Sequence, residues 1–394
     1  MKVLYIVSRS PDWFSTIIYF GLKELGVDVM EYPYNPLFHC SLEEGGIVVR
    51  DQCGTIVGRE NTNEGKVYID KSFAIVKRGA THTWIDRPNC WIQKERKSDV
   101  TSNLDNIDSY DCVISGTFRW DTISVIGNII NKVRDRFCLI DGEDDPYIRS
   151  VYLKSNTYFK RELLKKNEFF GSFYNPFGHA RYVAWTYFDH SIANVIPSLR
   201  NIGMCLCVPQ NRLIFRKEKL LSLSGTTIPP ARGEGAGSNI EKEYDISMIQ
   251  NSKSNLIRER FAAHLREFCA RNKLKSYIKT DGSIPWNDYV KIIKRSKCCV
   301  SMPGFGYDTS RYWEIPCYGS VLVSPNLPIE IRNNFKDMES AVFFKTLREF
   351  EVKISRVLRD GLWTEISKEG KRLFEDYHLP VNRAETVLRT FKRI

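Results

Sequence analysis

Strand-like and helix-like segments alternate along this chain, and no other feature of the sequence constrains its fold as much. KVLYIVS (residues 2–8) is strand-like, FSTIIYFGLKELG (14–26) repeats apolar residues at helical spacing, and VDVMEY (27–32) is strand-like again. This order predicts a βαβ unit with parallel strands. Further strand-like runs follow at residues 73–79, 110–116 and 136–142. The pattern is typical of a mainly parallel sheet covered by helices.

The alternation stops and then restarts in the second half. Residues 222–239, SLSGTTIPPARGEGAGSN, are rich in Gly, Pro, Ser and Thr without periodicity, which predicts a loop or linker. Strand-like segments then occur at 244–250 and 297–303, with helical segments at 254–272 and 286–296 between them. We therefore predict an α/β chain with an N-terminal domain (1–196), a linker region (197–243), a C-terminal domain (244–376) and a final helix (377–394).

Length and composition agree with a two-domain globular protein. The 394 residues exceed one ordinary domain, and 42% hydrophobic with 27% charged residues is a globular composition. No apolar run reaches the roughly 20 residues of a membrane-spanning helix, and the N-terminus turns polar too soon for a secretory signal. The eleven scattered cysteines then indicate reduced thiols. We expect a cytoplasmic protein without a structural metal site.

Charge is distributed unevenly between the two halves. Residues 1–196 contain 24 Lys and Arg against 25 Asp and Glu, whereas residues 197–394 contain 34 against 22. The basic excess is strongest at residues 253–297, with twelve basic and four acidic side chains. Such a segment favours an anionic partner, and the alternative is a set of ordinary solvated helix faces.

The segment VSMPGFGYDTSRYWEIPCYGSVLVS (300–324) gives the strongest indication of function. A strand ends in the turn GFGYD, and a helix and another strand follow. In open parallel sheets, ligands bind beyond the carboxyl ends of strands, where a helix N-terminus offers unpaired N–H groups to an anion. Gly304 and Gly306 would let the backbone approach a phosphate closely. We expect Arg311 to contact the same phosphates and Glu314 to accept hydrogen bonds from paired sugar hydroxyls.

A purely structural explanation covers only part of this segment. Asp308 or Thr309 is a good N-cap, and the aromatic residues that follow can belong to the core. Glu314, however, lies too far along the helix for a capping box with either residue. Pro316 also falls inside the helix, where proline destabilises or kinks it. The segment therefore predicts a nucleotide-sugar site.

Three stretches resemble GT-B glycosyltransferases, and in particular the CgeB-like branch of the group-1 glycosyltransferases. They are GFGYDTSRYWEIPCYGSVLV (304–323), YDISMIQNSKSNLIRERFAAHL (244–265), and LIDGEDDP with YFKREL (139–163). The resemblance implies two Rossmann-like domains that face each other across a cleft. The N-terminal domain would bind the acceptor, and the C-terminal domain would bind a nucleotide-diphosphate sugar. In this family the final helix commonly crosses back to the first domain.

The resemblance also implies the residues of the donor site. Glu314 matches the family's acidic residue that holds the ribose, and Arg258 lies where such enzymes often place a base that neutralises phosphate. Tyr307 stands where many members have a second glutamate, seven residues before Glu314, so the stereochemical outcome of the transfer stays open. The turn that faces the phosphates would consist of Gly304, Phe305, Gly306, Tyr307, Asp308 and Thr309, with Arg311 beside it.

Catalytic groups are less constrained by the sequence. An inverting transfer needs a general base near the acceptor hydroxyl, whereas a retaining transfer does not strictly require one. Asp12, after the first strand, is a candidate base, and the alternative is a helix N-cap. An acidic group that includes Asp141 and Asp144 follows a later strand, with Lys160 further along. We expect these carboxylates at the cleft, where they would orient acceptor hydroxyls, bind a divalent ion or form a turn.

The expected partners follow from the charge distribution. We expect no cofactor besides the nucleotide-sugar donor and no essential divalent metal, because basic residues would neutralise the diphosphate. The neutral N-terminal half favours a carbohydrate or lipid-linked glycan acceptor over a hydroxymethylated DNA base, since DNA binding depends on phosphate contacts. The basic half still permits contact with nucleic acid or an anionic membrane surface. A non-catalytic assembly module with the same fold is the third alternative.

Overall fold

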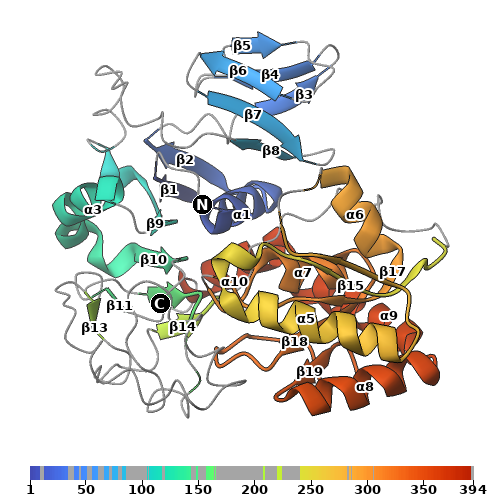
Figure 1. The fold of residues 1–394 in the computed structure, drawn as a ribbon. Coiled ribbons are helices and arrows are strands. Elements are labelled where there is room, and N and C mark those ends of the chain that lie inside the picture. Colours follow the sequence, from blue (N-terminus) through green and yellow to red (C-terminus); the bar gives the residue numbers. More distant parts are fainter. Residues whose placement is uncertain are drawn as a thin grey trace.

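The protein folds into two α/β domains, each built on a parallel sheet (Figure 1). The prediction of two parallel α/β domains is confirmed. Among the described residues, no helix is long and apolar enough to cross a membrane. The computed structural model describes residues 1–8, 13–33, 40–43, 46–50, 56–60, 66–70, 73–78, 82–85, 104, 106–117, 120–142, 148–149, 157–163, 165, 207–208, 220–223, 240–281, 284, 286–304 and 306–391.

Six parallel strands form the N-terminal sheet. Buried side chains of its central strands alternate between two cores, so both faces of the sheet are covered. Helices α1 (Trp13–Glu24) and α10 (Pro380–Phe391) pack on one face, and α3 (Trp120–Val133) packs on the other. The strand order is β14 (Leu220–Ser222), β12 (Thr157–Lys160), β10 (Phe137–Asp141), β9 (Cys112–Ser115), β1 (Lys2–Ile6) and β2 (Asp28–Tyr32).

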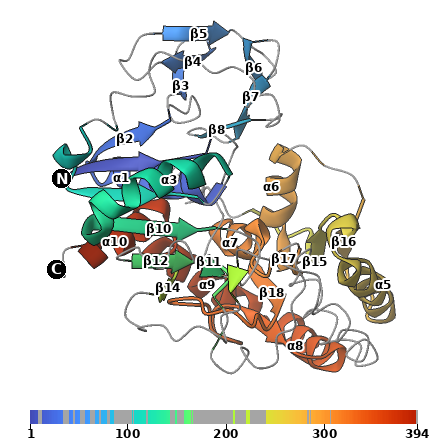
Figure 2. The ribbon, with the colours of Figure 1, turned by 90° about the vertical axis from the view of Figure 1, so that its left-hand side faces the viewer.

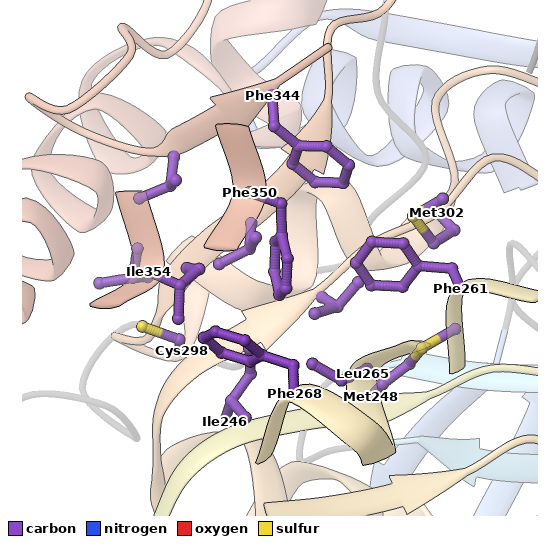
Figure 3. Packing of buried hydrophobic residues seen from close by; sticks show 14 of the residues in the cluster. Ile246, Met248, Phe261, Leu265, Phe268, Cys298, Met302, Phe344, Phe350 and Ile354 are labelled. Atoms are coloured by element: carbon purple, nitrogen blue, oxygen red, sulfur yellow. The ribbon is translucent and has the colours of Figure 1, made fainter. Parts of the chain in front are cut away.

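Five parallel strands form the C-terminal sheet. The strand order is β16 (Ser276–Lys279), β15 (Tyr244–Ile249), β17 (Ser296–Val300), β18 (Val321–Pro325) and β19 (Val342–Phe344). Helices α5 (Leu256–Arg271) and α8 (Leu347–Arg359) cover one face. There Phe350 lies among Phe261, Phe268 and Phe344 (Figure 3). Helices α6 (Trp286–Lys294) and α7 (Ser310–Cys317) cover the other face, and α9 (Trp363–Tyr377) contributes to both cores.

The C-terminal helix α10 packs against α1 in the N-terminal domain (Figure 2). A Cβ on Gly21 would lie 2.1 Å from the carbonyl oxygen of Pro380, so the two helices approach too closely for a side chain at that position. Ala384, Val387 and Leu388 of α10 join the core under β1. The last helix of the chain therefore ties the C-terminal domain to the N-terminal one.

Two parts of the fold differ from the expected organisation. Residues 220–222, which we assigned to the linker, form β14 at the edge of the N-terminal sheet, because β12 offers a free edge there. Residues 73–79 were expected in the parallel sheet, but β7 (Phe73–Arg78) pairs antiparallel with β6 (Lys66–Asp70) and β8 (His82–Ile85). Only two residues separate β6 from β7, too few for a parallel crossover, so they form a hairpin.

The remaining short elements lie outside the two main sheets. A second antiparallel sheet contains β3 (Cys40–Glu43), β4 (Gly46–Arg50) and β5 (Ile56–Glu60). β11 (Ile148–Arg149) pairs with β13 (Cys207–Val208). Single 3-10 turns occur at Ile107–Ser109, Arg134–Arg136 and Ser252–Ser254.

Candidate functional site

The order of the C-terminal strands defines where a ligand site is expected. β15 lies between β16 and β17, so the chain leaves β15 toward one edge of the sheet and later continues from β17 toward the other. The loops after β15 and β17 diverge at this point, and ligands in such sheets bind in the crevice that results. The predicted turn, residues 304–309, follows β17, and Arg258 lies at the start of α5 after β15. Topology thus brings the two predicted groups together.

Arg258 joins these two loops through its guanidinium. Its Nε donates to the carbonyl of Pro303 at 2.9 Å, and Nη2 donates to the carbonyl of Met302 at 3.1 Å. On the other side, Nη1 donates to the carbonyl of Asn251 at 3.0 Å and to the hydroxyl of Ser254. The side chain is only 4% exposed. Arg258 therefore supports the turn from behind, and its contact with phosphate stays a prediction.

Gly304 is the point at which the turn approaches Arg258 most closely. A Cβ on Gly304 would lie 2.7 Å from Nη2 of Arg258, so a larger residue would force the guanidinium or the turn to shift. The Gly304 N–H donates to the carbonyl of Gly306 at 2.9 Å, and its carbonyl accepts from Nδ2 of Asn255 at 3.2 Å. Asn255 also caps α5, because its Oδ1 accepts from the N–H of Ile257 at 3.1 Å. No pattern in the sequence indicated this double role of Asn255.

Two residues of the turn face the N-terminal domain. The N–H of Tyr307 donates to both carboxylate oxygens of Glu162, at 3.0 and 3.1 Å. Asp308 accepts from the indole N–H of Trp313 at 3.2 Å and lies 3.4 Å from Nε of Arg161. The side chains of all five residues are almost completely buried. Glu162 was not predicted as a site residue, because nothing in the sequence indicates which residue it meets 145 positions later.

Thr309 begins α7 without capping it through its side chain. Its backbone is extended, as an N-cap requires, but its hydroxyl pairs with that of Ser301 at 3.1 Å. No side-chain oxygen of Thr309 therefore occupies the N–H groups of the first turn of α7. These N–H groups lie beyond the carboxyl end of β17, where an anion is best accommodated.

Glu314 is held on α7 by a residue of the neighbouring helix. The phenol of Tyr289, on α6, donates to Oε2 of Glu314 at 2.5 Å. Burial, followed by repulsion from Glu314, raises the pKa of Tyr289 well above its ordinary value, so the phenol stays a neutral donor. Arg311 stacks on the same ring, with its guanidinium 5.7 Å from the ring centroid. Tyr289, which was not predicted as a site residue, thus orients both predicted donor residues.

Asp141 and Lys160 form an ion pair inside the N-terminal domain. Nζ of Lys160 lies 2.9 Å from Oδ1 of Asp141, and the phenol of Tyr158 donates to Oδ2. Both charged side chains are completely buried. The pair links the carboxyl ends of β10 and β12, so the structure brings these two predicted residues together without exposing either one. Their catalytic role stays a prediction.

Three predicted residues, Asp12, Asp144 and Phe305, lie outside the described residues. In the part of the chain that the structure describes, no three His, Cys, Asp or Glu side chains are grouped so that they would hold a metal ion. Six cysteines are buried and form no disulfide, and burial raises the pKa of their thiols: Cys112, Cys138, Cys269, Cys298, Cys299 and Cys317.

The C-terminal domain, which contains this site, matches a known protein family. Residues 253–389 match a family described as "Glycosyl transferase-like". The C-terminal domain is similar to glycosyltransferase domains over these residues. The matched segment contains Arg258, the turn, Arg311 and Glu314, so the resemblance expected from the sequence is confirmed for this domain. No curated protein sequence matches the chain.

Several solved structures are similar to the whole chain at low identity. TarM of S. aureus, solved in complex with Fondaparinux, alpha-GlcNAc-glycerol and UDP, is 10% identical with a TM-score of 0.45, covering 99% of this chain and 100% of its own. HepE of Anabaena, in complex with UDP, is 9% identical with a TM-score of 0.47, covering 100% of both chains. OtsA, a trehalose-6-phosphate synthase, is 12% identical with a TM-score of 0.46, covering 100% of this chain and 99% of its own. With TM-scores below 0.5, these likenesses add nothing to the roles of individual residues.

Proposed function

We propose that this glycosyltransferase binds a nucleotide-diphosphate sugar in its C-terminal domain and transfers the sugar to a hydroxyl of a carbohydrate or lipid-linked glycan. The observation that carries the proposal is the position of Glu314. Its carboxylate is 6% exposed, is oriented by Tyr289, and lies one turn into the helix that begins at the glycine turn, all within the matched segment. A carboxylate fixed in this way is suited to accept hydrogen bonds from the two hydroxyls of a ribose.

Arg311 supplies the positive charge for the diphosphate in this proposal. Its Nε is buried and has no hydrogen-bond acceptor among the described residues. A guanidinium N–H in this state would gain a charge-assisted hydrogen bond from a phosphate oxygen. Together with the N–H groups at the start of α7, Arg311 would stabilise the charge that develops on the diphosphate as it leaves.

The transfer itself makes one bond and breaks one. The acceptor oxygen bonds to the anomeric carbon, the bond from that carbon to the diphosphate breaks, and the hydroxyl proton passes to a base. Asp12 remains the candidate base of the N-terminal domain, and Asp144 remains a candidate for orienting the acceptor hydroxyls. Asp141 and Lys160 fit a supporting role, because both carboxylate oxygens of Asp141 are engaged and neither side chain is exposed.

The acceptor is assigned from the distribution of charge. The N-terminal half has no basic excess to grip a DNA backbone. In the basic segment 253–297, several charges are already neutralised within the domain: Arg271 pairs with Glu351, Arg295 with Glu243 and Lys297 with Asp245. These pairs favour a glycan acceptor over a DNA base, and over contact with an anionic membrane surface.

Thermal stabilisation by nucleotides tests the proposal. We expect one of ADP, GDP, UDP or dTDP, and its sugar conjugate, to raise the melting temperature, since a ligand at 100 times its Kd stabilises a protein by about 2.7 kcal/mol. Glu314→Gln should melt near the wild-type temperature without ligand and lose most of the shift. Glu369→Gln, which removes an exposed carboxylate paired with Arg372 on α9, is the matched control and should keep it. A wild-type protein that none of these ligands stabilises would contradict the donor assignment.

Mass analysis then identifies the acceptor. With the active donor, candidate glycans and lipid-linked glycans should gain the mass of one sugar, and hydroxymethylated DNA should not. Sugar incorporated into the DNA, with binding that falls steeply as salt rises, would replace the glycan by a DNA base.

A further inference from the structure

Two side chains of the N-terminal domain reach the turn of residues 304–309. Arg161 and Glu162 follow β12 directly, and both are almost completely buried. Glu162 accepts from the N–H of Tyr307 with both oxygens, and Arg161 forms an ion pair with Asp308. The turn that we assign to the donor is therefore held by contacts from the opposite domain as well as by Arg258.

The backbone beyond Glu162 fixes this segment to the C-terminal domain. The carbonyl of Leu163 accepts from the N–H of Glu330 at 2.6 Å, and the N–H of Lys165 donates to the carbonyl of Pro328 at 2.8 Å. Pro328 and Glu330 follow β18, the strand next to β17. Residues 161–163 and 165 thus contact the loops at the carboxyl ends of two neighbouring strands. Glu162 cannot move without disturbing the turn.

We propose that Arg161 and Glu162 are positioning residues of the donor site, which hold the turn of residues 304–309 in the conformation that binds the diphosphate. This inference rests on the proposed function of the site. Glu162 acts through the backbone of Tyr307, because its side chain is fully buried and does not face solvent.

The same cluster controls how much negative charge lies beside the turn. Burial, followed by repulsion from Asp308, raises the pKa of Glu162 well above its ordinary value, although Arg161 and the N–H of Tyr307 oppose this. The raised pKa favours the protonated form of Glu162, which hydrogen-bonds to Asp308, so ionisation of Glu162 at alkaline pH would add a negative charge beside the turn. A second charge would repel a diphosphate. The other charged or titratable groups that face the pair are Arg161, Arg383 of α10 and Tyr312 of α7.

Two variants of Glu162 separate positioning from a general loss of stability. Glu162→Ala removes the acceptor of the Tyr307 N–H, so amide hydrogen exchange at residues 306–309 should rise, and the Kd of the stabilising nucleoside diphosphate should increase at least about tenfold. Glu162→Gln mimics the protonated carboxyl, since its amide accepts from Tyr307 and donates to Asp308, and should stay within about threefold of wild type.

Glu31→Ala is the matched control. Glu31 is a buried carboxylate of β2 in the same domain that accepts from Tyr19, so its loss should lower stability without changing exchange in the turn or nucleotide affinity. Affinity is measured by calorimetry from pH 6 to 9.5. Wild-type affinity should fall at the alkaline end as Glu162 ionises, and Glu162→Gln should abolish this fall.

The outcomes distinguish this inference from the proposed function. The positioning role of Glu162 is contradicted if Glu162→Ala changes hydrogen exchange in the turn and nucleotide affinity no more than Glu31→Ala does. If nucleotide affinity still falls at alkaline pH in Glu162→Gln, or does not fall in wild type, the ionisation of Glu162 does not control the charge beside the turn. If no nucleoside diphosphate binds wild type, the proposed function fails, while the exchange measurement still decides whether Glu162 holds the turn.

Discussion

The phenol of Tyr289 donates a 2.5 Å hydrogen bond to the carboxylate of Glu314, across the contact between α6 and α7. Both side chains are at least 90% buried, and the raised pKa of Tyr289 keeps the phenol protonated. A carboxylate that is held by a rigid neighbour keeps one orientation, and a ligand then need not order it on binding. Substitution of either residue is accordingly the most direct test of the donor site.

Tyr289→Phe should weaken nucleotide binding while the fold is retained. The substitution removes only the hydroxyl, and hydrogen bonds to charged groups contribute about 1.5–3 kcal/mol, so we expect the Kd of the nucleoside diphosphate to rise about tenfold or more. Calorimetric titration measures the change. Tyr312→Phe is the control, because it removes an equally buried hydroxyl that donates to Asn334 at 2.7 Å rather than to Glu314. Equal losses of affinity in both variants would contradict an orienting role for Tyr289.

Gly304→Ala should destabilise the protein and weaken nucleotide binding. The new Cβ would lie 2.7 Å from Nη2 of Arg258, so either the arginine or the turn must move. Overpacking of this kind costs about 1–3 kcal/mol, which urea unfolding measures. The matched control is Gly127→Ala in α3, where a Cβ would have no neighbouring atom within 4 Å. This substitution should stabilise the helix by about 0.5–1 kcal/mol. A Gly304→Ala protein as stable as wild type would show that the turn adapts easily.

The strand, the glycine turn and the helix around residues 300–324 were predictable because their signals are local. Apolar runs, glycines and helical spacing fix each element within a few residues, and the ligand side of a parallel sheet follows from strand direction. The position of Glu314 relative to Gly304 needed no information from elsewhere in the chain. The pairing of Glu314 with Tyr289 was not predictable from local sequence, because it depends on how α6 and α7 pack on the sheet.

The contacts between the domains were not predictable for the same reason. Glu162 meets Tyr307 only because β12 ends beside the loop after β17, and no periodicity in either segment encodes that meeting. The contacts of Arg258 were not predictable either. Its position suited phosphate neutralisation, yet the strand order places two backbone loops within its reach. β14 was missed because three residues make too short an apolar run to read as a strand.

Acidification should destabilise the protein through His378. Burial, followed by the charge of Arg383, lowers the pKa of His378 to about 3, from about 6.5 in an exposed histidine. The folded state therefore binds fewer protons than the unfolded state between these values. The contribution of neutral His378 is complete above pH 6.5 and is lost as the pH falls toward 3. Urea unfolding should show a loss of about 1 kcal/mol per pH unit from this group.

A non-titrating variant isolates that contribution. In wild type, one ring nitrogen of His378 lies 3.0 Å from the carbonyl of Asn333 and the other 3.4 Å from Nη2 of Arg383. His378→Gln preserves a donor and an acceptor, so it should reduce stability at pH 7 and flatten the slope between pH 6.5 and 5. If the slope is the same in both proteins, other groups control the acid sensitivity.

Transfer should survive removal of divalent metal. In the proposed site, Arg311 and the N-terminal N–H groups of α7 neutralise the diphosphate, which is the task a bound magnesium or manganese ion would otherwise perform. Nucleoside diphosphate affinity and sugar transfer should therefore change less than about twofold in EDTA, with EDTA presaturated with magnesium as the control. Arg311→Ala should instead lose diphosphate affinity while retaining that for the bare nucleoside. Complete loss of transfer in EDTA, restored by magnesium or manganese, would assign the leaving-group charge to a metal. Asp144 would then be the candidate metal ligand, since both oxygens of Asp141 are engaged by Lys160 and Tyr158.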